Sequence, residues 1–286
     1  TQQVPFLAQA SARKNTALVG YKLNSMFEER FGKSFVSITL NTGADAVEAA
    51  LKHSELKRKM KLNEKVDTFI DSLRLLRQAQ RNESIRLDDV FLEQASLFLG
   101  VKVNDQNFSL IQLESSARNL LSIRPTCLSV KRGYHGKTTG ALQLTHGEPY
   151  RTPFSSLGPI SQFVCPDDTH SLENIILDTT IELPCIIRSG DKFEFKTERF
   201  FNISSLFVEP LQGEGGIHPL SKGFLQICRD MANQYDFSLI FDEIQSGMGR
   251  TGTFLFCEQT GVVPDVILLS KILGGGLSKI SVAAFE

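Results

Sequence analysis

The pattern of apolar and polar positions changes twice within the first part of the chain. Residues 9–31 contain few helix breakers, and their apolar positions recur at helical spacing until Gly32 ends the pattern, as a helix C-terminal glycine commonly does. The apolar stretch 35–40 is too short for a free-standing helix, and a new helical pattern begins directly after Gly43. These patterns predict a long helix, a strand and a second helix, in this order.

Residues 53–122 form a long polar and charged stretch in which apolar positions recur at helical intervals. This periodicity is typical of amphipathic helices and not of a flexible linker. We therefore expect several helices in this stretch and no active-site chemistry.

Short apolar runs follow, and turns or helical segments separate them. One of these segments, residues 224–235, has apolar residues spaced three or four apart, which is the mark of an amphipathic helix. Alternation of this kind predicts an α/β domain with a mostly parallel sheet. The expected strands lie at residues 127–130, 206–208, 237–241 and 266–269.

Composition narrows the kinds of partner that this domain can have. The chain of 286 residues has a net charge of −1 and is 41% hydrophobic, which is the balance of an ordinary globular protein. A chain without a basic excess has no electrostatic footprint for nucleic acid or for an acidic membrane surface. We therefore expect a small-molecule ligand, no nucleic acid and no membrane.

The five cysteines are odd in number and widely scattered, with no CxxC pair and no histidine at metal-ligand spacing. They indicate reduced core thiols, no metal site and a cytoplasmic protein. No apolar run approaches the roughly 18 residues that span a bilayer, and no charged-then-apolar leader opens the chain. The chain begins at Thr1 and not at a methionine, so we expect a piece of a longer protein.

Two of the expected strands end in residues that carry chemistry. The first runs from residue 237 into Asp242, and the second runs from residue 266 into Lys271 and then into three glycines. Ligands of open α/β sheets lie beyond the carboxyl ends of the strands. A carboxylate and an amine are therefore expected side by side at a ligand site, which is what pyridoxal 5'-phosphate chemistry requires.

Each of these two residues has a defined task in that chemistry. The cofactor accepts electrons only while its pyridine nitrogen stays protonated, and a buried Asp such as Asp242 achieves this through a charge-assisted hydrogen bond of roughly 1.5–3 kcal/mol. A lysine such as Lys271 loses its proton to form an imine with the cofactor and can then move a proton on the substrate. Asp242 and Lys271 are therefore the candidate catalytic residues.

Five stretches of the chain resemble motifs of one family and occur in that family's order, which makes chance agreement very improbable. They are NTGADAVEAALK (41–52), YHGKT (134–138), VEPLQGEGG (208–216), FDEIQSGMGRTG (241–252) and SKILGGG (270–276). The chain thereby resembles the class III pyridoxal-phosphate-dependent aminotransferases, whose members act on ornithine, acetylornithine or GABA.

The resemblance implies a fold and a domain organisation. It implies the large domain of a fold-type I PLP-dependent transferase, an α/β domain whose mostly parallel sheet is flanked by helices. Residues 1–52 and 123–286 would form this domain, and residues 53–122 would be an added helical insertion, because the family uses a shorter interval there. An N-terminal segment and a C-terminal small domain of the family would lie outside the chain.

Roles at the cofactor are also implied by the resemblance. The backbone amides of Gly43 and Ala44 would hold the cofactor phosphate at a helix N-terminus, where unpaired N–H groups favour an anion. Tyr134 would stack on one face of the pyridine ring, Ile244 would pack on the other face, and Gln245 would hydrogen-bond the phenolic oxygen.

The same resemblance assigns residues around the substrate. His135 would be a positioning or packing residue beside the cofactor, and Glu214 matches the acidic residue that faces the substrate. Lys137 stands where acetylornithine-type members often have an arginine that binds a substrate carboxylate. Because a lysine offers a point charge and not a bidentate fork, an acetylornithine substrate is less secure than the reaction class.

The implied function is the transfer of an amino group from an amine or ω-amino acid to a keto acid through a Schiff base on Lys271. Since class III active sites are built at a dimer interface, a homodimer is implied as well. Two alternatives stay open: an aminomutase or racemase that uses the same cofactor, and a catalytically incomplete member with a role in assembly or regulation. The intact Lys271 and Asp242 argue against the last alternative.

Overall fold

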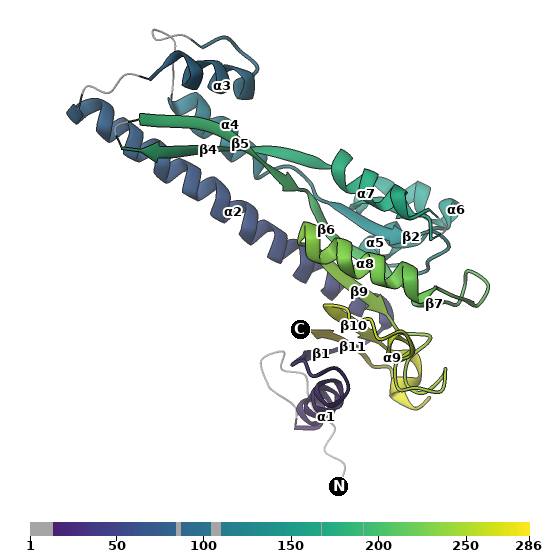
Figure 1. The fold of residues 1–286 in the computed structure, drawn as a ribbon. Coiled ribbons are helices and arrows are strands. Elements are labelled where there is room, and N and C mark those ends of the chain that lie inside the picture. The colour runs from purple at the N-terminus through teal and green to yellow at the C-terminus, as the bar shows by residue number, and fades with distance from the viewer. Residues whose placement is uncertain (1–13, 84–86, 104–109, 167, 191) are drawn as a thin grey trace.

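A seven-stranded sheet forms the centre of the molecule (Figure 1). The structure is a computed structural model, and it describes residues 14–83, 87–103, 110–166, 168–190 and 192–286. Strand β11 runs antiparallel to both of its neighbours, and the other four strand pairs of the sheet are parallel. The mostly parallel α/β sheet that the sequence predicts is thereby confirmed. In sheet order the strands are β1 (Val36–Leu40), β11 (Ser281–Phe285), β10 (Val266–Leu269), β9 (Ser238–Asp242), β6 (Ile203–Val208), β2 (Thr126–Val130) and β3 (Ile160–Val164).

The inner strands are buried along their whole length because helices cover both faces of the sheet. Successive residues of β9 show this directly, since Leu239 and Phe241 pack into one apolar cluster and Ile240 packs into another. The first cluster contains residues of α1, α7 and α8, and the second contains residues of α2 and α5. These helices are α1 (Lys14–Phe31), α2 (Gly43–Glu83), α5 (Thr139–Leu144), α7 (Thr169–Asp178) and α8 (Lys222–Tyr235).

The predicted elements and the observed ones agree closely where the apolar pattern is strong. The helix expected at residues 9–31 is α1, and its predicted positions 9–13 lie outside the described residues. The helix expected at 224–235 is α8, which begins at the N-cap Ser221. Short elements complete the fold: α6 (Glu148–Arg151), η1 (Thr152–Leu157), β7 (Leu211–Gln212), β8 (His218–Pro219), α9 (Cys257–Thr260) and η2 (Lys271–Gly274).

Helix α2 continues far beyond the sheet and carries a second core. It contacts α4 (Leu110–Leu120) and β4 (Thr180–Ser189), which forms a hairpin with β5 (Lys192–Phe201). Helix α3 (Asp89–Leu99) joins this part by contacting β5 and α4. The apolar cluster of this part unites residues as distant as Phe69, Phe91, Leu113 and Phe195. We call the far half of α2 together with α3, α4, β4 and β5 the arm, which extends away from the sheet in Figure 1.

The arm contains the helices expected for residues 53–122, and it also contains a hairpin that the sequence did not predict. Helix α2 crosses the expected domain boundary at residue 53 without a break, so local structure does not mark that boundary. The domain division therefore stays a prediction. In the part of the chain that the structure describes, no helix is long and apolar enough to cross a bilayer.

Candidate active site

A cavity of about 270 Å³ opens at the carboxyl ends of β2, β6, β9 and β10 and at the start of α2. This is the edge of the sheet at which the sequence placed a ligand. Its size lies just below the roughly 300 Å³ at which ligand pockets commonly begin. The lining residues are Gly43, Ala44, Tyr134, His135, Gly136, Lys137, Glu209, Asp242, Ile244, Gln245, Ser270 and Lys271.

The cavity thus brings together every residue expected at the cofactor, along with Lys137. Glu214, the other residue expected at the substrate, does not line this cavity and is exposed in the turn between β7 and β8. Sequence reasoning had not singled out Gly136, Glu209 or Ser270.

Lys271 lies two residues after the end of β10, and its backbone is in the left-handed region with φ of 45°. A non-glycine residue in this region is strained by about 1 kcal/mol or more, and such strain is concentrated at functional sites. Its Nζ donates to Oε1 of Gln245 at 3.0 Å. The amine therefore projects into the cavity beside a neutral amide.

Asp242 and His135 form a buried pair at the base of the cavity. Nδ1 of His135 lies 2.8 Å from Oδ2 of Asp242, and the backbone N–H of Ile244 donates to the other carboxylate oxygen at 3.2 Å. Burial lowers the pKa of His135, but the hydrogen bond to Asp242 and the negative charges of Asp242 and Glu209 outweigh it, so the net direction is upward. Nε2 of His135 is buried and has no protein hydrogen-bond partner among the described residues.

Glu209 directly follows β6, as Asp242 is the last residue of β9, and it is only 4% exposed. Its Oε1 accepts the backbone N–H of Tyr134 at 2.6 Å, and its Oε2 accepts that of Gly213 at 3.4 Å. Burial, reinforced by the charge of Asp242, raises the pKa of Glu209 to about 7 although His135 opposes this. Its position at the end of a buried strand was the signal in the sequence that could have identified it.

The start of α2 forms the opposite wall of the cavity. Thr42 and Asp45 cap it reciprocally, since each side chain accepts the backbone N–H of the other residue. The amides of the first turn have no acceptor within the helix and favour an anion. A Cβ at Gly43 would lie 2.8 Å from Cδ1 of Ile244, so glycine is needed for the helix to approach this wall.

Lys137 lies at the exposed rim of the cavity. Its Nζ lies 5.3 Å from the centroid of the Tyr150 ring, a cation–π distance. The backbone of Gly136 before it has φ of 121° and packs against Ala44, where a Cβ would come within 2.9 Å of the alanine Cβ. Residue 136 therefore has to be glycine for the Lys137 loop to close over the start of α2.

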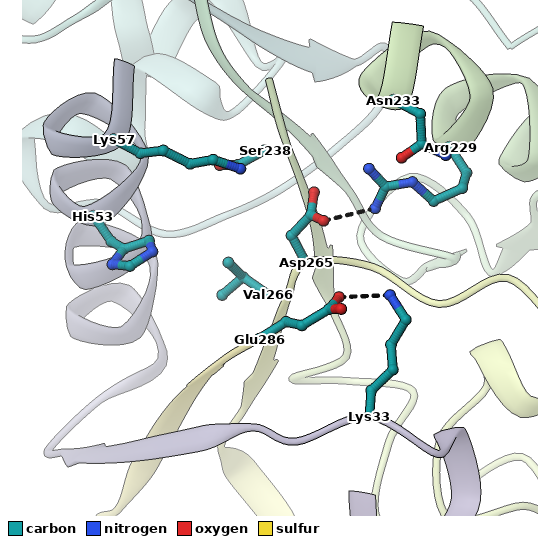
Figure 2. Close-up of a pocket in the computed structure, with 9 residues that line it drawn as sticks. All are labelled: Lys33, His53, Lys57, Arg229, Asn233, Ser238, Asp265, Val266 and Glu286. Carbon is teal, nitrogen blue, oxygen red and sulfur yellow. Dashed lines mark hydrogen bonds and ion pairs between the residues drawn. The ribbon is translucent and has the colours of Figure 1, made fainter. Parts of the chain in front are cut away.

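A second cavity of about 450 Å³ lies at the opposite edge of the sheet, at the amino ends of β9 and β10 (Figure 2). Its acidic side chains are paired with basic ones, Asp265 with Arg229 at 2.9 Å and Glu286 with Lys33 at 2.6 Å. No group of three His, Cys, Asp or Glu in the described ranges could hold a metal ion. The Lys271 cavity is therefore the better candidate for an active site.

The fold and this cavity are those of an α/β domain with a small-molecule pocket at the carboxyl ends of a mostly parallel sheet. Comparison with known proteins then gives the family. A family model described as Aminotransferase class-III matches residues 3–285, and the chain belongs to this family.

Curated relatives match about half of the chain at moderate identity. The acetylornithine aminotransferase of Methanosarcina acetivorans is 34% identical over 160 residues, which are 55% of this chain and 34% of that protein. The aminotransferase PigE of a Serratia species is 36% identical over 151 residues, which are 53% of this chain and 15% of that protein. The match thus covers only 34% and 15% of these two relatives.

Solved structures agree with the fold over nearly the whole chain. The ornithine aminotransferase of Toxoplasma gondii matches with a TM-score of 0.59 and 22% identity, covering 96% of this chain and 46% of that one. A PLP-bound amine transaminase from an uncultivated Pseudomonas species matches with a TM-score of 0.61 and 18% identity, covering 97% and 49%. The chain therefore spans about half the length of these structures, and the likeness establishes the fold.

Proposed function

We propose that this chain provides the pyridoxal-phosphate site of an aminotransferase that moves an amino group from an amine or ω-amino acid to a keto acid. The single observation that supports this proposal most is the shared cavity of Lys271, Asp242 and the start of α2. Those features bring an amine, a buried carboxylate and an anion-binding helix terminus to one small space. The family and its named relatives support the same reaction class.

The residues of the cavity fit this cofactor. Gly43 leaves room for a group at the helix terminus, because a side chain there would collide with Ile244. The amides of Gly43 and Ala44 would bind the phosphate, and Asp242 would face the pyridine nitrogen from the buried side. The cofactor, when bound, supplies an aldehyde that condenses with amines and a ring that withdraws electrons from the attached carbon.

The remaining side chains would orient and protect the reacting centre. Tyr134 and Ile244 would flank the ring on its two faces and exclude water from it. Lys271 would attach the cofactor through Nζ and, once released by substrate, would carry a proton to and from the substrate carbon. Gln245, which already contacts Nζ at 3.0 Å, would hold that amine in position.

Substrate contacts, assembly and compartment belong to the same proposal. Lys137 at the rim would attract a substrate carboxylate as a point charge, and Glu214 would face the substrate from the turn between β7 and β8. We place the protein in the cytoplasm as a homodimer. Residues 1–52 and 123–286 would form the cofactor-binding domain, and residues 53–122 the added helical part.

The test is covalent labelling of the purified chain with pyridoxal phosphate, followed by borohydride reduction and peptide mapping by mass spectrometry. The cofactor mass should appear on the peptide that contains Lys271, and it should disappear in Lys271→Ala. Lys57→Ala, in the wall of the second cavity, is the matched control and should label like the wild type. Labelling spread equally over surface lysines would contradict the proposal.

A further inference from the structure

Glu209 lies in the cavity but has no task in the proposed function. It is buried, it directly follows β6, and it accepts two backbone N–H groups from two different turns. Tyr134 lies in the turn after β2, and Gly213 lies in the turn after β7. A single carboxylate therefore connects two segments that are about 80 residues apart in the chain.

Each of these turns forms one part of the cavity. The first carries the Tyr134 ring and His135, which pairs with Asp242. The backbone of the second turn packs against the side chain of Gln245, and a Cβ at Gly213 would lie only 2.2 Å from the Gln245 carboxamide. Gln245 in turn accepts from the amine of Lys271.

A second link joins the same two turns outside the cavity. Nε2 of Gln212 donates to the backbone oxygen of Lys131 at 2.7 Å, and neither residue lines the cavity. Gly215 also lies so close to Arg132 that a Cβ would come within 2.8 Å of its backbone oxygen. The packing of the turns thus has an outer contact through Gln212 and an inner contact through Glu209.

We propose that Glu209 is a positioning residue that fixes the distance between the two turns, and so holds Tyr134 and the Gln245–Lys271 pair at their places around the cofactor. This inference rests on the proposed function for the identity of the bound group. In the two contacts of Glu209, each carboxylate oxygen accepts one backbone N–H group. Protonation turns one of these oxygens into an O–H donor, so both contacts together require the ionised carboxylate.

The titratable groups that face Glu209 decide when that carboxylate is ionised. They are His135 from the turn after β2 and Asp242 from the end of β9, while Lys137 and Lys271 line the same cavity from two further loops. Since its pKa is raised to about 7, Glu209 changes its charge near neutral pH. The inner contact should therefore form as the pH rises through about 7.

The probe for this contact is pyridoxamine 5'-phosphate, which cannot condense with Lys271, so its affinity reports non-covalent fit alone. In Glu209→Gln the amide can accept only one of the two N–H groups, and affinity at pH 8 should fall about tenfold, the loss of one charge-assisted hydrogen bond. The ratio between wild type and variant should approach one at pH 6, where Glu209 of the wild type is protonated. Gln212→Ala, which cuts the outer contact, should show no such pH-dependent ratio.

A measurement on the protein without cofactor separates this inference from the proposed function. In ¹⁵N NMR spectra of the wild type, the amide signals of Tyr134 and Gly213 should titrate together near pH 7, and both titrations should vanish in Glu209→Gln. Independent titration of the two amides, or an affinity ratio that stays equal at pH 6 and pH 8, would overturn the inference. If the wild type does not bind pyridoxamine phosphate at either pH, the proposed function fails, and the amide titration still decides the role of Glu209.

Discussion

Strands β9 and β10 have a cavity at each end, and the two cavities neutralise their charges differently. At the amino ends, Asp265 and Glu286 each form an ion pair with a basic side chain (Figure 2). At the carboxyl ends, about 13 Å away along β9, Asp242 pairs with His135, but the Lys271 amine contacts a neutral amide and burial raises the pKa of Glu209 to about 7. The carboxylates at the amino ends are matched by cations, whereas the Lys271 amine at the carboxyl ends contacts a neutral amide and remains available to a ligand.

The largest expected effect on stability lies at the amino ends. Asp265→Ala removes the ion pair with Arg229 and the hydrogen bond to the backbone N–H of Leu239, and it leaves a mostly buried guanidinium without its carboxylate. We expect the free energy of unfolding to fall by about 3 kcal/mol, measured by urea denaturation. Asp230→Ala removes an exposed carboxylate from α8 and should cost less than about 0.5 kcal/mol. If both variants lost the same free energy of unfolding, the ion pair of Asp265 would contribute no more to stability than a solvated carboxylate does.

The matching change at the carboxyl ends should weaken binding, and it also removes the carboxylate that pairs with the buried His135. Asp242→Asn keeps the shape of the side chain but removes the charge that would face the pyridine nitrogen. The loss of one charge-assisted hydrogen bond, about 2 kcal/mol, should lower the affinity for pyridoxal phosphate about 30-fold in a fluorescence titration. Asp265→Asn is the same substitution at the other cavity, and its cofactor affinity should equal that of the wild type. A comparable loss in both variants would mean that Asp242 acts only through the fold.

Stability should depend on pH through Glu209. Its pKa is raised to about 7 in the folded protein from an ordinary value near 4.5, so the folded state binds the proton more tightly than the unfolded state does. The resulting stabilisation is complete below about pH 4.5 and is lost as the pH rises through about 7, by roughly 3 kcal/mol in total. Unfolding free energies measured between pH 5 and pH 8 should show this loss.

Glu209→Gln should flatten that profile, because the amide does not titrate. Glu214→Gln changes an exposed carboxylate in the neighbouring turn and should leave the profile as it is in the wild type. His135, whose pKa is also raised, contributes a loss in the same direction, so a residual slope is expected in the Glu209 variant. A variant profile identical to that of the wild type would show that Glu209 does not carry the dependence.

The smallest expected effect has the opposite sign. Lys271→Gly relieves a left-handed backbone and should raise the free energy of unfolding by about 1 kcal/mol, measured by thermal or urea denaturation. Under the proposed function, the same variant should no longer attach the cofactor. Lys279→Gly, at a nearby residue without a positive φ, should lower stability or leave it unchanged. A gain at position 279 as large as that at 271 would mean that backbone strain is not the cause.

The sequence predicted the parts of the fold whose burial is uniform. Strands β2, β6, β9 and β10 are short apolar runs because both of their faces are covered, and such runs are conspicuous in the sequence. The hairpin of β4 and β5 was missed although Phe193 and Phe195 alternate with exposed residues in β5. Its buried face packs on α2 and α3, a long-range contact that local patterns do not reveal.

The candidate site was predicted in the same uneven way. Asp242 and Lys271 were found because each stands directly after an apolar run, at the edge where ligands bind. Glu209 stands at an equivalent place after β6. It was missed because its raised pKa depends on burial, and its contacts to two turns depend on backbone amides that are distant in the sequence. The roles of Glu214 and Lys137 at the substrate stay predictions.

Helix α2 has a mechanical consequence that follows from its length. One end begins at Gly43 in the wall of the cavity, and the other end lies in the core of the arm, 41 residues along a continuous helix. At 1.5 Å per residue this is a rod of about 60 Å, so a tilt of about 5° at the cavity displaces the far end by about 5 Å. A small rotation of the start of α2 would therefore appear as a much larger displacement of the arm.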